Sequence, residues 1–324
     1  MKYFAVTVTY GDRIKYLEEV VSALLAQRID AIVIVINGSS GKCTSQIKTL
    51  FRQHGNITLI DLGENTGSAN GFSEGMNYAY RNGADFIWLL DDDNKPQAGA
   101  LNALKNNWEV FNPDNLKLVS LLSYRSDRNV YRDAIQAKNP FFMLGPKNSF
   151  LGFDLVSKLK NAFSKSKIEN DTSITEGNVA VAPYGGMFFN RHLIDVIGYP
   201  DKDFFLYADD HDFSYRITQK EGEILLVLDS RLIDLETSFH LKKTSRIFNT
   251  RFFGTDSKDA IYYSVRNNVF FEKHFVLNRF LYGINKYLYI FLLSFMMILH
   301  PKNLWKFSLI LKAISDSKKF KNND

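Results

Sequence analysis

The 324-residue chain lacks several features that assign proteins to common classes. It has one cysteine, Cys43, so no internal disulfide can form, which fits a reducing cytosol. Because no activating residues adjoin Cys43, we interpret it as a small loop residue and not as a nucleophile. The amino-terminal stretch MKYFAVTVTY begins as a strand, without the basic and apolar regions of a signal peptide. These absences predict a cytoplasmic protein.

The carboxyl-terminal part contains one strongly apolar run, Leu288–Leu299 (LYIFLLSFMMIL). This run is shorter than the ~20 residues needed to cross a bilayer. Aromatic residues and lysines flank it, among them Lys286, Tyr287 and Lys302. Two interpretations stay open: a helix that lies in the membrane interface with its lysines near lipid phosphates, and an ordinary buried helix.

The formal net charge of +5 conceals an asymmetry along the chain. Residues 241–324 contain 15 lysines and arginines against 5 acidic residues, so the remainder is net negative. A basic tail attracts an anionic surface, either a nucleic acid or the cytoplasmic leaflet of a membrane. No recognised nucleic-acid-binding motif accompanies the charge. We therefore predict a peripheral position on the inner face of the cytoplasmic membrane and no nucleic-acid partner, and leave the oligomeric state open.

The first 123 residues alternate between strand and helix patterns, which predicts an α/β fold with a mostly parallel sheet and right-handed crossovers. The predicted strands are Phe4–Thr9, Ala31–Ile36, Ile57–Asp61, Asp85–Leu90 and Leu116–Ser123, and the predicted helices are Ile14–Leu25 and Gly71–Tyr80. In such sheets, ligands bind at the carboxyl ends of the strands. The segments after three of these strands, at Thr9, Asn37 and Asp91, are therefore expected to line one crevice.

Regular patterns are interrupted after this first half. Residues 124–178 are polar and irregular, and we interpret them as an insertion or flap. Order returns with a predicted strand at Val179–Pro183, the turn Tyr184–Gly186, and a predicted helix at Arg191–Ile197. The expected domains are a catalytic domain over 1–240, divided into 1–123, 124–178 and 179–240, and a basic, partly apolar helical region over 241–324.

Three consecutive aspartates, Asp91, Asp92 and Asp93, follow the apolar run Phe86–Leu90 directly. Carboxylates at the end of a buried strand repel one another unless a cation joins them. Alternate carboxylates at this position suit a hard divalent cation, Mg²⁺ or Mn²⁺, with open positions for phosphate oxygens. A solvated acidic turn is the alternative, and the position after a core strand favours the metal site.

The loop from Asn65 to Gly71 (NTGSANG) leads into the helix expected to follow it. Small residues before a helix let backbone N–H groups approach a phosphate, which the helix dipole favours. The sequence matches neither a P-loop nor a G-x-G-x-x-G fingerprint. A phosphate contact and a tight packing turn both remain possible from these residues alone.

A second acidic cluster, Asp209, Asp210 and Asp212, follows the aromatic run Phe204–Tyr207. Asp209 is a candidate N-cap, and Asp212 can pair with Arg216 at the i,i+4 spacing of a helix. A carboxylate in a first turn is stabilised in its ionised form and can serve as a general base. His240 lies further on, and a metal already held by two aspartates could accept its imidazole.

Taken together, these stretches resemble the inverting family-2 glycosyltransferases with a GT-A fold, most of all bacterial rhamnosyl- and galactofuranosyltransferases of surface polysaccharide and O-antigen synthesis. The matching motifs are VTVTYGDRIKYLEEVVSALLAQ, IVIVINGSSG, NTGSANGFSEGMNYAYRNGADFIWLLDDDNKP and YGGMFFNRHLIDVIGYPDKDFFLYADDHDFSYRITQKEG. They occur in the family's order and cover a little under half of the chain. The resemblance implies a GT-A-type, Rossmann-like domain followed by a helical carboxyl-terminal region.

The resemblance also implies a role for each matching residue. Asp91, Asp93 and His240 would bind Mn²⁺ or Mg²⁺, and Asp210 would be the catalytic base. The donor nucleotide sugar would contact Thr9, Tyr10, Asn37, Asn65, Gly67 and Asp92. The acceptor glycan would contact Asp209, Tyr184, Gly185 and Gly186.

The implied reaction moves a sugar from a nucleotide diphosphate, UDP-galactofuranose, another UDP-sugar or dTDP-rhamnose, to a hydroxyl of a lipid-linked glycan. Two alternatives are a sugar-nucleotide nucleotidyltransferase and a non-catalytic scaffold of a polysaccharide assembly complex. The first usually has a basic, glycine-rich amino-terminal loop, for which Tyr10–Arg13 is a poor substitute. The second is disfavoured because every acidic position of the motifs is present.

Overall fold

The computed structural model describes residues 1–112, 114–115, 117–163, 173–236 and 254–320. The chain divides into two compact units. The first, here called the sheet unit, comprises Met1–Met143, Ile168–Phe205 and Asp209–Glu236. The second, the helical unit, comprises Leu144–Lys167, Leu206–Ala208 and Thr237–Asp324. The domain boundary predicted at residue 240 stays a prediction, because that residue lies outside the described ranges.

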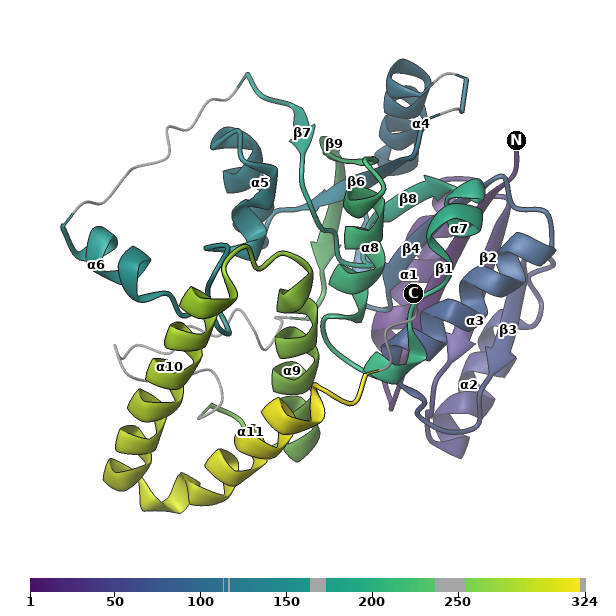
Figure 1. The fold of residues 1–324 in the computed structure, drawn as a ribbon. Coiled ribbons are helices and arrows are strands. Elements are labelled where there is room, and N and C mark those ends of the chain that lie inside the picture. Colours follow the sequence, from purple (N-terminus) through teal and green to yellow (C-terminus); the bar gives the residue numbers. More distant parts are fainter. Residues whose placement is uncertain (113, 116, 164–172, 237–253, 321–324) are drawn as a thin grey trace. The chain divides into compact units, whose positions relative to one another are not determined.

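Within the described residues of the sheet unit, nine strands form one mixed sheet in the order β3-β2-β1-β4-β8-β6-β9-β5, with β7 paired to β9 (Figure 1). The strands from β1 to β4 run parallel to one another, whereas β8 is antiparallel to both β4 and β6. The bounds are β1 Tyr3–Thr9, β2 Ala31–Ile36, β3 Ile57–Asp61, β4 Phe86–Asp91, β5 Asn94–Pro96, β6 Val119–Arg125, β7 Glu176–Asn178, β8 Met187–Asn190 and β9 Glu223–Asp234.

Helices cover both faces of this sheet, because the buried strands are apolar on both sides. Along β4, Phe86 and Trp88 enter one core with α1, α2 and α4, and Ile87 enters the other with α3, α5, α7 and α8. The bounds are α1 Ile14–Ala26, α2 Gly41–Phe51, α3 Gly67–Arg81, α4 Ala100–Phe111, α5 Asn129–Gln136, α7 His192–Ile197 and α8 Asp209–Gln219, with short 3₁₀ helices η1 Pro140–Leu144 and η2 Lys202–Phe204. This arrangement confirms the predicted α/β class with a central sheet.

Some local predictions were wrong. Val179–Pro183 is buried but is not a strand. The Val179 amide still donates to Ile224 O of β9, but the Ala182 amide donates to Ser214 Oγ of α8 at 2.9 Å, so the pairing does not continue. Cys43 is not a loop residue, since it lies in α2 and is buried there. The segment expected to be an irregular flap contains α5, whose buried Tyr131 and Ile135 pack into the sheet unit's core.

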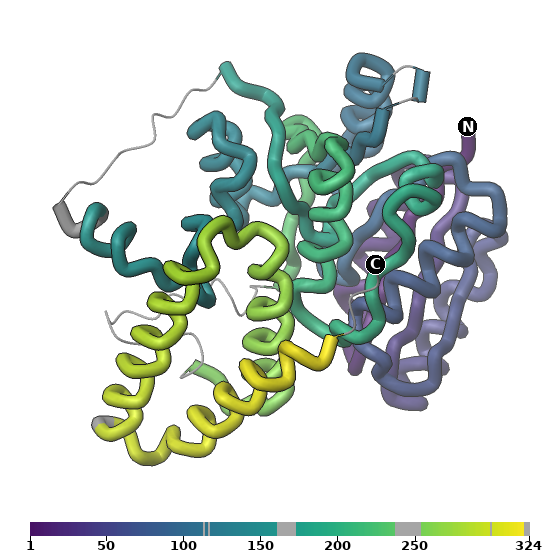
Figure 2. The backbone as a smooth tube through the Cα atoms, viewed as in Figure 1, coloured from purple at the N-terminus to yellow at the C-terminus, as the bar shows by residue number. Residues whose placement is uncertain are grey.

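The helical unit contains α6 Leu155–Phe163, α9 Lys258–Phe271, α10 Arg279–Leu299 and α11 Leu304–Asp316, with the 3₁₀ helices η5 Glu272–His274 and η6 Pro301–Asn303. Figure 2 traces α10 through η6 and back along α11. The core of the helical unit joins side chains of α9, α10 and α11, among them Val265, Leu293 and Ile310. By length and composition alone, Arg279–Ile298 could cross a membrane, and 17% of its most apolar window is buried. The apolar run is therefore part of a longer helix than its 12 uncharged residues indicate.

Candidate active site

The strand register brings three of the predicted positions to one edge of the sheet. Thr9 at the end of β1 pairs with Ile36, the residue before Asn37, and Val8 pairs with Asp91 at the end of β4. Thr9 Oγ1 donates a hydrogen bond of 2.6 Å to Asp92 Oδ2. The acidic run and the end of β1 therefore form one site, as expected for the carboxyl ends of neighbouring parallel strands.

The guanidinium of Arg13, a residue with no role predicted from sequence, lies among the carboxylates at the end of β4. Its Nε donates to Asp92 Oδ1 at 2.9 Å and one of its terminal nitrogens lies 3.0 Å from Asp93 Oδ2. Its other terminal nitrogen pairs with Glu236. Burial raises the pKa of Asp92 to about 7, even though Arg13 and the Thr9 hydroxyl both favour its charged form. The carboxylates of Asp92, Asp93 and Glu236 thus share the single positive charge of Arg13.

A second buried arginine, Arg125 at the end of β6, lies on the other side of the run. One of its terminal nitrogens is 3.6 Å from Asp91 Oδ2 and 3.5 Å from Asp234 Oδ1 of β9. Asn94 donates to Asp234 at 2.8 Å and accepts from Arg125 at 3.1 Å, so it joins these two residues through hydrogen bonds. The Asp91 side chain itself is 41% exposed. The network holds one side of Asp91 and leaves the other accessible.

The turn Tyr184–Gly186 closes against this network. A Cβ on Gly185 would overlap Asn94 Oδ1 and lie 2.7 Å from Asp91 Oδ2, so only glycine fits there. Gly186 has a φ of +105°, and its amide donates to Leu89 O of β4 at 2.8 Å. The two glycines therefore let the backbone come close to Asp91.

The loop before α3 is joined to both the sheet edge and the second acidic cluster. Asn37 Nδ2 donates to Gly67 O at 2.9 Å, and Asn37 Oδ1 accepts from the Thr66 amide at 2.8 Å. A Cβ on Gly67 would overlap Phe205 O, and the φ of +85° at this residue also favours glycine. Asn65 Oδ1 accepts from the Gly67 amide at 3.0 Å. These bonds fix the loop, so the packing explanation accounts for its glycines.

The second acidic cluster forms the first turn of α8, which begins at Asp209. Ser68 Oγ donates to Asp209 Oδ2 at 2.7 Å, while Asp212 pairs with Arg216 at 2.8 Å, as its i,i+4 spacing predicted. Burial, followed by the neighbouring Asp210, raises the pKa of Asp209. Asp210 is less buried than Asp209.

The two acidic clusters lie within electrostatic reach of each other. The pKa of Asp91 is raised to about 6, first by the loss of hydration at this crowded end of the sheet, although 41% of the side chain stays exposed. Arg125 opposes the shift, and Asp93 and Asp210 add to it. Asp210 is therefore close enough to Asp91 to disfavour its charged form. Two carboxylates that repel at the mouth of a sheet create a region where a cation or a positively charged transition state is stabilised.

The remaining predicted residues have simpler settings. Tyr10 is 53% exposed, and its ring lies 5.3 Å from the Arg13 guanidinium. Tyr184 is buried, and burial raises its pKa well above the ordinary value, with Asp209 adding to the shift. His240 lies outside the described residues.

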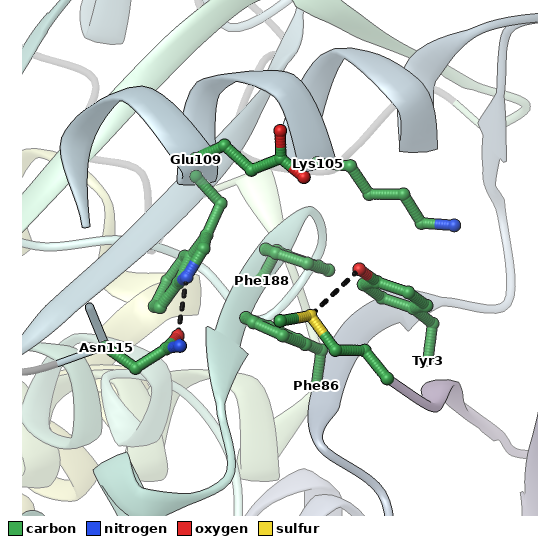
Figure 3. Close-up of a pocket in the computed structure, with 8 residues that line it drawn as sticks. Tyr3, Phe86, Lys105, Glu109, Asn115 and Phe188 are labelled. Carbon is green, nitrogen blue, oxygen red and sulfur yellow. Dashed lines mark hydrogen bonds between the residues drawn. The ribbon is translucent and has the colours of Figure 1, made fainter. Parts of the chain in front are cut away.

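A small cavity lies at the opposite edge of the sheet, where β1 begins (Figure 3). Its walls include the stacked rings of Tyr3, Phe86 and Phe188, and Lys105 Nζ lies 3.8 Å from the Tyr3 ring centroid. Its volume is about 30 Å³, room for water and not for a nucleotide. This cavity is therefore not the donor site.

Solved structures with similar folds identify the fold class of this chain. Two solved structures with similar folds are the mannosyltransferase PcManGT from Pyrobaculum calidifontis in complex with GDP-Man and Mn²⁺ and residues 1–349 of S. aureus TarS in complex with UDP-GlcNAc. The first matches at a TM-score of 0.53 and 14% identity, over 99% of this chain and 76% of that one. The second matches at a TM-score of 0.51 and 15% identity, over 86% and 68%. These likenesses show a shared GT-A fold.

The family model described as glycosyl transferase family 2 matches residues 4–182, more than half of the chain. The protein therefore belongs to glycosyl transferase family 2. It is 25% identical over 208 residues to galactofuranosyltransferase GlfT1 of Mycolicibacterium smegmatis, a match that covers 60% of this chain. The matched region spans about three fifths of that relative's length.

Proposed function

We propose that this protein is an inverting glycosyltransferase that moves a sugar from a nucleotide diphosphate to the hydroxyl of a glycan acceptor. Membership of the family supports the reaction class. The observation that carries the assignment to this site is that the start of α3 is bonded on one side to Asn37 at the sheet edge, through Gly67 O, and on the other, through Ser68, to Asp209 beside Asp210. One cluster can face the donor diphosphate while the other faces the acceptor.

The residues at the end of β4 fit a divalent cation. Asp91 and Asp93 offer carboxylate oxygens, and burial raises the pKa of both groups although Arg125 and Arg13 oppose the shift, so a further cation would favour their charged forms. Within the described ranges no three His, Cys, Asp or Glu side chains gather as a metal site. Mg²⁺ commonly takes one or two carboxylates and completes its shell with water and substrate phosphates, so two aspartates suffice. When bound, Mn²⁺ or Mg²⁺ would offset the charge of the leaving diphosphate; His240 would be a third protein ligand.

Asp210 is proposed as the general base. Its carboxylate would take the proton of the acceptor hydroxyl as that oxygen attacks the sugar C1 from the face opposite the diphosphate. The C1–oxygen bond to the nucleoside diphosphate would break, and its electron pair would leave with the diphosphate. Asp209, held by Ser68, would orient the acceptor together with Tyr184, Gly185 and Gly186.

On the donor side, Thr9 and Tyr10 would contact the nucleotide and Asp92 the ribose. Asn37, Asn65 and Gly67 would shape the pocket, since they form one hydrogen-bonded loop beside the sheet edge. The similarity to a galactofuranosyltransferase supports UDP-galactofuranose as the first donor to test, with dTDP-rhamnose and other UDP-sugars next. The proposed acceptor is a lipid-linked glycan of surface polysaccharide or O-antigen synthesis, which places the enzyme peripherally on the cytoplasmic membrane.

The test is release of nucleotide from UDP-, GDP- and dTDP-sugars, with Mn²⁺ or EDTA, by wild type and Asp210→Asn. Metal-dependent release from one donor, reduced about 10²–10⁴-fold in the variant, is the expected result. Asp212→Asn, which removes a charge one turn away that already pairs with Arg216, is the matched control and should keep activity. Equal turnover by Asp210→Asn would refute the base assignment. If metal-dependent nucleotide binding were also absent, the scaffold would be the better explanation.

A further inference from the structure

The outer face of α10 carries a continuous stripe of exposed apolar side chains. Phe280 is 76% exposed, Tyr287 73%, Phe291 65% and Ile298 75%, and Ile284 and Phe295 lie between them on the same face. The spacings along this stripe are three and four residues, which is the repeat of one helical face. A contiguous exposed apolar surface of this kind marks an interaction site.

The inner face of the same helix is already occupied by protein. Leu293 and Met297 are buried in the core of the helical unit, together with side chains of α9 and α11. Asn285 is buried too, and its amide nitrogen donates to Asp154 Oδ2 at 2.7 Å and to Asn148 O at 2.8 Å. A helix that crossed a bilayer would bring this carboxylate into hydrocarbon, which is costly. The helix is therefore suited to lie along a surface with one side immersed.

The charges around the stripe select the kind of surface. Residues 254–320 contain ten lysines and arginines against four acidic residues. Three of the four carboxylates already have partners: Asp256 pairs with Lys306, Glu272 accepts from Tyr282, and Asp316 pairs with a lysine. Exposed cations remain at both ends of the stripe, at Arg279 before Phe280 and at Lys302 after α10.

We propose that the stripe Phe280–Ile298 seats the protein on an anionic lipid bilayer, with α10 in the plane of the interface and not across the membrane. Apolar side chains enter the headgroup and acyl boundary, while the flanking cations meet lipid phosphates. Trp305, 38% exposed at the start of α11, is an aromatic residue of the kind enriched at membrane–water interfaces. This inference rests on the peripheral location proposed above and names the surface responsible for it.

The test is co-sedimentation of the full chain with phosphatidylcholine vesicles, with and without phosphatidylglycerol. Wild type should sediment with the anionic vesicles and be released by high salt or alkaline carbonate. Phe291→Glu with Ile298→Glu should lower the fraction bound about tenfold or more, because two charges enter the apolar stripe. The matched control is Val110→Glu, which places a charge at a 75% exposed valine of α4 and should change nothing.

Three results would overturn the proposal. Wild-type protein could fail to sediment with anionic vesicles, or Val110→Glu could lower the bound fraction as much as the double variant does. Binding that resists alkaline carbonate would show a helix that spans the membrane. Loss of self-association with unchanged vesicle binding would instead assign the stripe to a second copy of the chain. Thermal unfolding checks that the variants fold, and a milder pair, Phe291→Ser with Ile298→Ser, should show intermediate binding. Metal-dependent nucleotide binding, measured in parallel without vesicles, separates failure of this proposal from failure of the proposed reaction.

Discussion

The side-chain amide of Asn267 donates a hydrogen bond of 2.9 Å to the backbone carbonyl oxygen of Tyr207. The same amide donates its other hydrogen to Leu206 O at 2.7 Å. Both bonds lie within the helical unit. Tyr207 and Ala208 have positive φ values of +66° and +60°, which non-glycine residues adopt at a cost of about 1–3 kcal/mol each. Asn267 therefore holds a strained segment of chain that leads directly into Asp209.

From this contact we predict that Asn267→Ala lowers kcat at least about tenfold, because the proposed base would be less well positioned. It should also lower the free energy of unfolding by about 1–3 kcal/mol, since two partly buried carbonyl oxygens lose their donor. The measurement is kcat beside the Kd for nucleotide, which should stay unchanged. Asn268→Ala is the control, because Asn268 bonds only one turn back, to Ser264 O, in α9. A parallel loss of nucleotide affinity would contradict a positioning role.

Arg13 should compete with a divalent cation for the same carboxylates. Replacing it in Arg13→Gln removes the charge shared by Asp92 and Asp93, so the metal-free protein should unfold at a lower temperature. The same change should tighten Mn²⁺ binding severalfold, because the ion no longer displaces a guanidinium. Calorimetric titration with Mn²⁺ in the absence of nucleotide measures this. Lys15→Gln removes an exposed cation in the first turn of α1, two residues from Arg13, and should leave both quantities unchanged. Weaker Mn²⁺ binding by Arg13→Gln would disprove the competition.

Gly185 sets how closely the backbone approaches Asp91. In Gly185→Ala, the added methyl group would overlap Asn94 and displace the Asp91 carboxylate. We expect a loss of about 1–3 kcal/mol in stability from overpacking, together with weaker metal and donor binding. Chemical denaturation and Mn²⁺ titration measure the two effects. The control is Gly41→Ala, where no atom lies within 4 Å of the new Cβ, and a Gly185→Ala protein with wild-type metal affinity would count against the predicted displacement.

The raised carboxyl pKa values predict an unusual pH dependence for the metal-free protein. Asp92 has a folded pKa of about 7 against about 4 when unfolded, so the folded state holds a proton that the unfolded state has released in this window. Stability in EDTA should therefore fall as the pH rises from about 4 to about 7, by up to about 1.4 kcal/mol per pH unit for such a group. Saturating Mn²⁺ binds the deprotonated form and should reduce or reverse this slope.

Urea denaturation at several pH values, with EDTA or Mn²⁺, measures this behaviour. Asp92→Asn cannot titrate and should show a flatter dependence in EDTA. Asp91, with a folded pKa of about 6, acts in the same direction. Metal-free wild-type protein that became steadily more stable between these pH values would show that the carboxylates are not held as the structure indicates.

The sequence predicted the strands of the first half well because each is a short β-rich run bounded by a turn signal. Ala31–Ile36 and Ile57–Asp61 match β2 and β3 to the residue. The prediction was wrong for Val179–Pro183, whose apolar pattern reflects burial, while side chains of α8 bond to the backbone at Ala180 and Ala182. Burial and strand pairing leave the same pattern in a short run, so sequence alone does not separate them.

The acidic residues of the site could be found from sequence because they follow apolar runs, but their partners could not. Arg13 and Asp92 are 79 positions apart, and Asn94 and Arg125 are 31 apart. Only the strand order brings these residues together. The one available signal for Arg125 was a charged residue at the end of the apolar strand β6. The roles of the individual site residues remain predictions.

The single cysteine has a practical consequence. Cys43 lies buried in α2, 3% exposed and enclosed by the core of the sheet unit. A thiol introduced at an exposed position would therefore be the preferred target of a maleimide probe in the folded protein, without prior removal of the native one. A polarity-sensitive fluorophore at position 291 or 298 would report its own immersion depth directly, against the same dye at position 110.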